Sequence, residues 1–197
     1  IGGDFATAYL LDKLPIPVVA HRNYGLPGWA RGPQTLVICS SHSGNTEETL
    51  SSFNEALGRG CSLMSICTGG KLAELSKENG KICWIFDHVG QPRTAIGWAV
   101  GLLLALFFRL GLIEDQSLAV EEAAAVLAEG TAKLGKDSPV SSNPAKRMAG
   151  QLLGRNIVIF GAGEMEVISR RWKSEVNELA KAWAAFEGIP EMNHNAL

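Results

Sequence analysis

An apolar run turns into a hydroxyl-rich loop within TLVICSSHSGNTEETL, which is residues 35–50 of the chain. Residues 35–39 are typical of a buried strand, and the residues from Glu47 onward begin a segment with helical periodicity. The first backbone N–H groups of a helix have no partner within it, and the helix dipole places about half a positive charge there. A loop between a strand and a helix N-terminus is therefore a favourable place for an anion.

Three hydroxyl side chains flank the glycine of this loop: Ser41, Ser43 and Thr46. Each hydroxyl can donate a hydrogen bond to a phosphate oxygen, and Gly44 lets the backbone approach a ligand closely. The alternative is an ordinary helix cap, in which Ser43 or Asn45 accepts from the first turn. A cap accounts for one hydroxyl and not for three, yet chemistry alone leaves both interpretations open.

Short apolar runs alternate with longer periodic segments along the whole chain. The strands that we expect are residues 18–21, 35–40, 62–67, 81–86 and 156–160. The helices that we expect are residues 4–14, 46–58, 71–78, 92–112, 117–134, 144–153 and 164–185. The strands are rich in Val, Ile, Leu and Cys with little polar alternation, which is typical of strands buried on both faces. The sequence therefore predicts an α/β fold, a parallel sheet flanked by helices.

A polar stretch with two prolines, residues 135–144, separates two helical patterns and is typical of a linker. The strand–loop–helix pattern restarts at residues 155–163. We therefore expect one domain at residues 1–140 and the beginning of a second, similar domain at residues 141–197. Because no initiating methionine is present and the last residues contain no closing element, we expect the chain to be a fragment.

The bulk composition excludes several classes of function. A formal net charge of −2 gives no reason to expect nucleic acid or an anionic membrane as a partner. The longest apolar stretch, residues 95–108, is shorter than the roughly 20 residues that span a membrane, so it predicts a buried helix. The four cysteines have no CxxC spacing and the four histidines have no ligand spacing. We expect a cytoplasmic protein with buried thiols, no metal and no cofactor.

Residues 41–49 resemble the S-x-S-G-x-T-x-E-T signature of SIS domains, in which the matching Ser41, Ser43 and Thr46 hold a sugar phosphate. The likeness extends over nearly the whole chain to the bifunctional phosphoglucose/phosphomannose isomerases. It is carried by residues 1–4, by Pro92-Arg93 before a long apolar helix, and by residues 171–181 and 190–195. It implies the flavodoxin-like three-layer sandwich of SIS domains, without the first strand and glycine-rich loop and without most of the second SIS domain.

The same resemblance implies an aldose–ketose isomerase that interconverts glucose 6-phosphate, and also mannose 6-phosphate, with fructose 6-phosphate through an enediol. Glu178 would move the proton between C2 and C1, and Arg93 would stabilise the enediolate oxygen. His194 would open the sugar ring, delivered into the neighbouring subunit's site of a homodimer. Glu175 is the rival base, three residues away on about the same helix face. Without the resemblance, both glutamates are a solvated stripe that pairs with nearby basic residues.

Other functions stay open. A non-catalytic sugar-phosphate regulator uses the same fold, although it would not need Glu178 or His194. An SIS isomerase of another phosphosugar also fits, because the sequence defines the phosphate end better than the sugar end. Residues 161–166 resemble a dinucleotide loop, but Glu166 occupies the third glycine position and its carboxylate would repel a pyrophosphate. We therefore interpret them as the matching loop of the second SIS domain.

Overall fold

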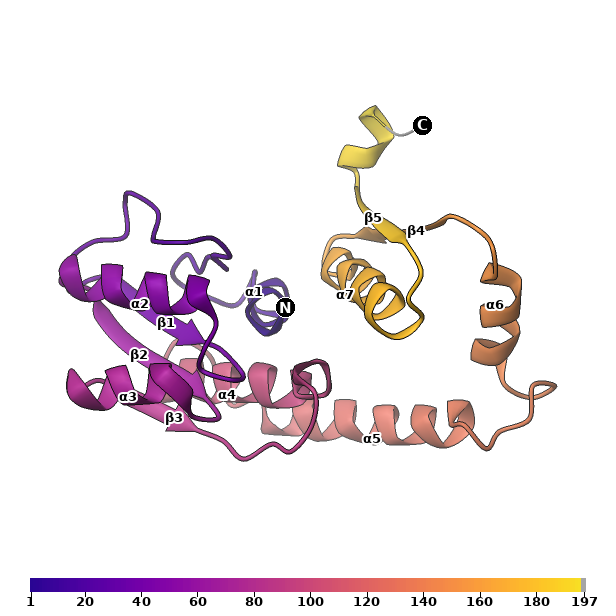
Figure 1. Cartoon of the computed structure of the whole chain (residues 1–197), viewed down its shortest axis with the longest axis horizontal. Helices are drawn as coiled ribbons and strands as arrows, with labels where there is room; N and C mark the ends of the chain where they lie inside the picture. The colour runs from indigo at the N-terminus through magenta and orange to yellow at the C-terminus, as the bar shows by residue number, and fades with distance from the viewer. Residues whose placement is uncertain (196–197) are drawn as a thin grey trace. The chain divides into compact units, whose positions relative to one another are not determined.

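The structure is a computed structural model that describes residues 1–195 and is drawn in Figure 1. The chain divides into two compact units. The first unit comprises residues 2 and 17–103, and the second comprises residues 1, 3–16 and those from Leu104 onward. Helix α1 (Gly2–Tyr9) begins the chain, and α4 (Ile96–Arg109) runs from the first unit into the second.

A parallel three-stranded sheet forms the centre of the first unit. Its strands are β1 (Leu36–Ser40), β2 (Ser62–Cys67) and β3 (Ile82–Ile85), in the order β1-β2-β3. Helix α2 (Glu47–Gly58) connects β1 to β2, and α3 (Gly70–Glu78) connects β2 to β3. Two right-handed crossovers between neighbouring strands place both helices on one face of the sheet. They share a single buried cluster with the strands, made of Cys39, Phe53, Ala56, Cys61, Leu63, Cys67 and Leu72.

The parallel register brings three loops to one edge of this sheet. Ser40 of β1 lies beside Ile66 of β2, and Cys67 of β2 lies beside Ile85 of β3. The carboxyl ends of all three strands therefore coincide, and the loops at residues 41–46, 68–69 and 86–91 all begin there. This edge is where open α/β sheets bind ligands. The short helix η1 (Pro92–Thr94) follows the third loop.

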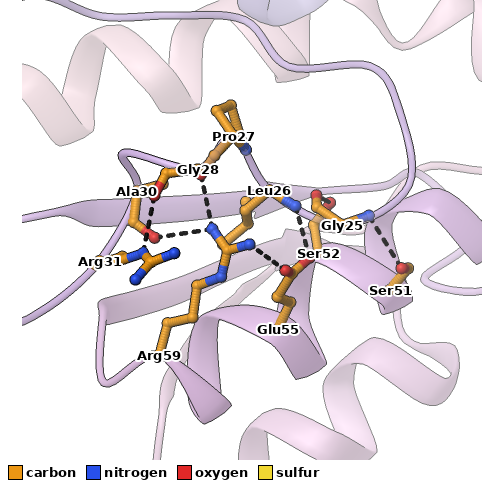
Figure 2. A network of polar contacts seen from close by, with 10 residues as sticks. All are labelled: Gly25, Leu26, Pro27, Gly28, Ala30, Arg31, Ser51, Ser52, Glu55 and Arg59. Atoms are coloured by element: carbon orange, nitrogen blue, oxygen red, sulfur yellow. Dashed lines mark hydrogen bonds and ion pairs between the residues drawn. The ribbon is translucent and has the colours of Figure 1, made fainter.

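Glu55 in α2 and Arg59 at the C-terminal end of α2 hold the segment that precedes β1 (Figure 2). Glu55 Oε2 accepts a hydrogen bond from the backbone N–H of Leu26 at 2.7 Å, and Glu55 also pairs with Arg59. The Arg59 guanidinium donates to the carbonyl oxygens of Pro27 at 2.6 Å and Ala30 at 3.2 Å. These hydrogen bonds satisfy backbone groups of a segment that belongs to no β-sheet. The segment is therefore fixed against α2 by side chains.

The second unit contains α5 (Ser117–Leu134), α6 (Pro144–Leu152) and a βαβ arrangement. Strands β4 (Ile157–Ala162) and β5 (Ala184–Ile189) are parallel, and α7 (Met165–Leu179) connects them and packs against both. The short helix η2 (Glu191–His194) follows β5. The domain boundary expected near residue 140 falls between α5 and α6 and stays a prediction.

The expected strand at residues 18–21 is wrong. This stretch pairs with no other strand among the described residues, and Val19 is 60% exposed. Pro15 and Pro17 precede it, and a proline has no N–H to donate to a ladder. The apolar composition of these residues therefore reflected a surface segment.

The expected helix at residues 164–185 ends six residues early, and the strand β5 was missed. Lys181 has a positive φ of 55°, which stops the helix. Asn177 Oδ1 then accepts a hydrogen bond from the backbone N–H of Ala184 at 3.1 Å and turns the chain into β5. The residues in between are strong helix formers, so only the tertiary pairing of β5 with β4 reveals the strand.

The long apolar helix is α4, preceded by the separate 3₁₀ turn η1, so Arg93 lies in that turn and not in the first turn of α4. Leu103, Leu104 and Phe107 of α4 are buried, whereas Trp98 and Phe108 are 45% and 47% exposed. Among residues 1–195, no helix is long and apolar enough to cross a membrane.

Candidate functional site

The loop at residues 41–46 lies between β1 and α2, as the sequence predicted. Thr46 is the N-cap residue of α2, and its side chain makes no capping hydrogen bond. Ser43 Oγ accepts from the backbone N–H of Asn45 at 3.2 Å, a local turn, while Asn45 Oδ1 accepts from the backbone N–H of Lys71 at 3.0 Å. Neither residue caps the helix, so the first-turn N–H groups of α2 keep their capacity to bind an acceptor.

The three hydroxyls divide into one buried and two exposed groups. The Ser41 hydroxyl lies within the loop, where its oxygen accepts from the backbone N–H of Gly44 at 3.1 Å and lies 2.8 Å from Thr46 Oγ1. Ser43 and Thr46 are exposed. Ser41 therefore holds the loop closed and orients Thr46, while the two exposed hydroxyls are accessible to a ligand.

The backbone of this loop is interlocked with the next loop along the sheet edge. The carbonyl oxygen of His42 accepts from both the backbone N–H and the hydroxyl of Thr68, at 2.9 and 2.7 Å. The carbonyl oxygen of Gly44 accepts from the backbone N–H of Leu72 at 2.9 Å. Gly44 has a φ of 70°, and a Cβ there would overlap the carbonyl oxygen of Gly69. Two loops thus fix each other, which is the preorganisation that an anion site needs.

Sequence reasoning missed a line of side chains that leads from this loop toward Arg93. His42 Nε2 lies 2.9 Å from His88 Nδ1, and His88 Nε2 lies 3.2 Å from Thr94 Oγ1. Thr94 follows Arg93 in η1, and Arg93 is half-buried. The histidines looked scattered because 46 positions separate them in the chain. The available signal was that both follow strands ending at the same edge of the sheet.

The proposed acid–base residues belong to the second unit. Glu178 is exposed near the end of α7, and the exposed His194 ends η2. Glu175, the rival base, forms an ion pair with Arg171 one helical turn away. The loop at residues 41–46 and Arg93 lie in the first unit, so the assembly of all these residues into one site stays a prediction.

Glu166 of α7 lies beside a glycine of the β4–β5 pair. Gly161 and Gly188 are paired in the register of β4 and β5. A Cβ on Gly188 would lie 2.8 Å from the carboxyl carbon of Glu166, so the Glu166 side chain packs against this glycine. That position supports our interpretation against a pyrophosphate ligand, since the carboxylate would repel it.

Comparison with known proteins finds the same family along the chain. Residues 141–197 match the model of the bacterial phospho-glucose isomerase C-terminal SIS domain. A bifunctional phosphoglucose/phosphomannose isomerase from Caldicellulosiruptor bescii is 40% identical over 100% of this chain and 58% of its own length. A D-glucosamine-6-phosphate 4-epimerase from Sulfolobus acidocaldarius is 30% identical over 100% of this chain and 61% of its own length. The chain thus spans about three fifths of these relatives.

A solved structure shows the same fold. The C-terminal domain of glucosamine-fructose-6-phosphate aminotransferase from Francisella tularensis aligns with a TM-score of 0.70 and 18% identity, over 99% of this chain and 57% of its own. The parallel sheets, the flanking helices and the loop after β1 agree with the fold that the sequence predicted. Together with the sequence relatives, they show that the chain belongs to the SIS-domain family of the bifunctional phosphoglucose/phosphomannose isomerases.

Proposed function

We propose that the full-length protein interconverts glucose 6-phosphate, and mannose 6-phosphate, with fructose 6-phosphate. The observation that carries this proposal is the uncapped start of α2, where the exposed hydroxyls of Ser43 and Thr46 lie beside the buried Ser41. The similarity of the whole chain to a bifunctional phosphoglucose/phosphomannose isomerase supports the reaction. The proposal includes a cytoplasmic location, because all four cysteines are free, as in a reducing compartment.

In this proposal, the loop at residues 41–46 binds the phosphate and so fixes one end of the sugar. A hydrogen bond to a charged group contributes about 1.5–3 kcal/mol, so two exposed hydroxyls and the backbone N–H groups of α2 form a substantial anchor. Binding energy at this remote group orients C1 and C2 for the chemical step.

The chemical step needs a base, a cation and a group that opens the ring. Glu178 would remove the C2 proton of the aldose and return it to C1. With the transfer of the hydroxyl proton from O2 to O1, this yields the ketose without net oxidation. Arg93 would stabilise the negative charge that develops on the enediolate oxygen. His194 would transfer the proton that opens the sugar ring, across the interface of a homodimer.

The exposure of the two carboxylates on α7 supports Glu178 over Glu175. The Glu175 side chain is 28% exposed and is paired with Arg171. Glu178 lies one turn further along and is exposed. A carboxylate at that place is accessible to a substrate, whereas the half-buried Glu175 is less so.

A second candidate is a different reaction on a hexose phosphate. The relative named as a D-glucosamine-6-phosphate 4-epimerase matches the whole chain, so the same phosphate loop is compatible with chemistry at C4. A regulator that binds a sugar phosphate without turnover is the third. All three use the loop at residues 41–46, and exchange of the C2 hydrogen with solvent distinguishes the isomerase from the other two.

The test measures exchange of the substrate C2 hydrogen in heavy water by proton NMR, with the full-length protein and each hexose 6-phosphate. We expect exchange by the wild type, and a loss of roughly 10²–10⁴-fold for Glu178→Gln with little change in KM. The matched control Glu175→Gln should stay within a few-fold of wild type. If Glu175→Gln loses exchange instead, the base is three residues earlier than proposed. Binding without exchange would refute the isomerase and leave the other two candidates.

A further inference from the structure

Aromatic ring contacts and a nearby glycine shape the surroundings of the hydrogen-bonded series His42–His88–Thr94. The two imidazole rings meet edge to face at 5.1 Å between centroids, and the His42 ring lies 5.9 Å from that of Phe86. A Cβ on Gly90 would lie 3.0 Å from His88 Cε1 and 3.2 Å from Thr94 Oγ1. The glycine therefore leaves the space in which the second imidazole reaches Thr94.

Counting hydrogens along this line assigns one tautomer to each ring when both are neutral. The Thr94 hydroxyl has one proton and donates it to the carbonyl oxygen of Gln91 at 2.8 Å. Its contact with His88 Nε2 at 3.2 Å then requires that His88 carry its proton on Nε2. A neutral His88 accepts on Nδ1, so His42 must donate from Nε2 across the 2.9 Å contact. The basic nitrogen left over is His42 Nδ1.

We propose that His42 takes up a proton on Nδ1 when a phosphate dianion binds the loop at residues 41–46, and so supplies the positive charge that this loop otherwise lacks. The inference rests on the proposed phosphate site. The loop contains no Lys or Arg, and His42 lies between Ser41 and Ser43. Nδ1 is bonded to Cγ, so it is the ring nitrogen nearer to the backbone of the loop. Protonation there leaves the Nε2–H bond to His88 intact.

The segments next to the loop carry charged groups of both signs. An imidazole changes charge near neutral pH, and a nearby anion favours the charged form. The titratable and charged groups on the loop's own helix and on the neighbouring segments have both signs: Glu47 and Glu48 on α2, Lys71 on α3, Asp87 and His88 after β3, and Arg93 in η1. The dianion itself is the new charge that shifts the balance toward the imidazolium.

Inorganic sulfate is the probe that isolates the protein's proton, because it stays a dianion at neutral pH whereas a phosphate ester takes up its own proton near pH 6. Calorimetric titration of the full-length protein in buffers of different ionisation enthalpy gives the number of protons taken up per sulfate bound. We expect wild type to approach one proton per sulfate near pH 7.5, and its affinity to weaken up to roughly tenfold per pH unit above neutrality.

The variants separate this inference from the phosphate site itself. Proton uptake should vanish in His42→Gln and persist in His88→Gln, and also in His21→Gln, an exposed histidine elsewhere in the same unit. Wild-type binding without uptake overturns the inference, even if His42→Gln does not fold. Uptake that persists in His42→Gln overturns it as well. Sulfate binding that is unchanged in a Ser43→Ala/Thr46→Ala double variant, or absent from wild type, refutes the phosphate site and the inference together.

Discussion

Replacing Gly44 by alanine tests whether the loop at residues 41–46 depends on its interlock with the next loop. Gly44 has a φ of 70°, in the left-handed region, and a Cβ there would overlap the carbonyl oxygen of Gly69. Both atoms are held by backbone, so the overlap cannot be relieved by a side-chain rotation. The two loops must separate to admit the methyl group.

The expected cost has two parts that a matched variant separates. A non-glycine residue in the left-handed region costs about 1–2 kcal/mol. Separation of the loops also weakens the backbone bonds from Thr68 to His42 and from Leu72 to Gly44, each with a net contribution of about 0.5–1.5 kcal/mol. Gly60 has a φ of 67°, and a Cβ there would meet no atom within 4 Å. Gly60→Ala therefore carries the first cost alone, and the difference should be about 1–3 kcal/mol.

Amide hydrogen exchange followed by NMR reads this difference locally. In Gly44→Ala, the backbone N–H groups of Thr68 and Leu72 should exchange roughly 5- to 150-fold faster than in Gly60→Ala, since about 1.36 kcal/mol corresponds to a factor of ten. Sulfate affinity should fall in Gly44→Ala and not in Gly60→Ala. Equal exchange at Thr68 and Leu72 in the two variants would refute the interlock as the element that shapes the loop.

Three further outcomes follow from the structure. Burial raises the pKa of Cys39 from 9.0 to about 12, so folding retains a proton that the unfolded chain releases. Urea unfolding should therefore show stability falling as pH rises from about 9 toward 12, by up to about 1.4 kcal/mol per pH unit, and Cys39→Val should reduce that slope. Asn177→Ala removes the acceptor of the Ala184 N–H and should cost about 1–2 kcal/mol, whereas Asn177→Asp, which keeps an acceptor, should cost less in the same assay. Light scattering of the full-length protein should give a dimer mass, and a monomer mass across the micromolar range would contradict the shared role of His194.

The sequence was sufficient to predict an element where the residues that contact it are also close to it in the chain. The apolar run before Ser41, the hydroxyl loop and the periodic segment after it became β1, the loop and α2 with little change. The sequence failed where pairing partners decide the outcome. Residues 18–21 have strand composition but no partner strand among the described residues, and residues 184–189 pair with β4 although the run before them has helical composition. In both cases the presence or absence of a pairing partner decided the outcome over local propensity.

The same distinction between local sequence and tertiary contacts applies to the candidate site. Hydroxyls that lie within six residues of each other could be predicted as a group, because the loop brings them together by itself. The meeting of His42 with His88 could not, since it depends on two crossovers that return β3 to the edge where β1 ends.

The choice between the two carboxylates of α7 involves both the local sequence and the structure. Sequence spacing places Glu178 and its rival Glu175 on about the same helix face, and in the structure Glu178 is exposed whereas Glu175 is half-buried beside Arg171. A base must present its lone pair to the substrate, and an exposed carboxylate is more accessible for this than a half-buried one. The assignment of the base to Glu178 therefore stays a prediction, which the exchange measurement on the two variants tests.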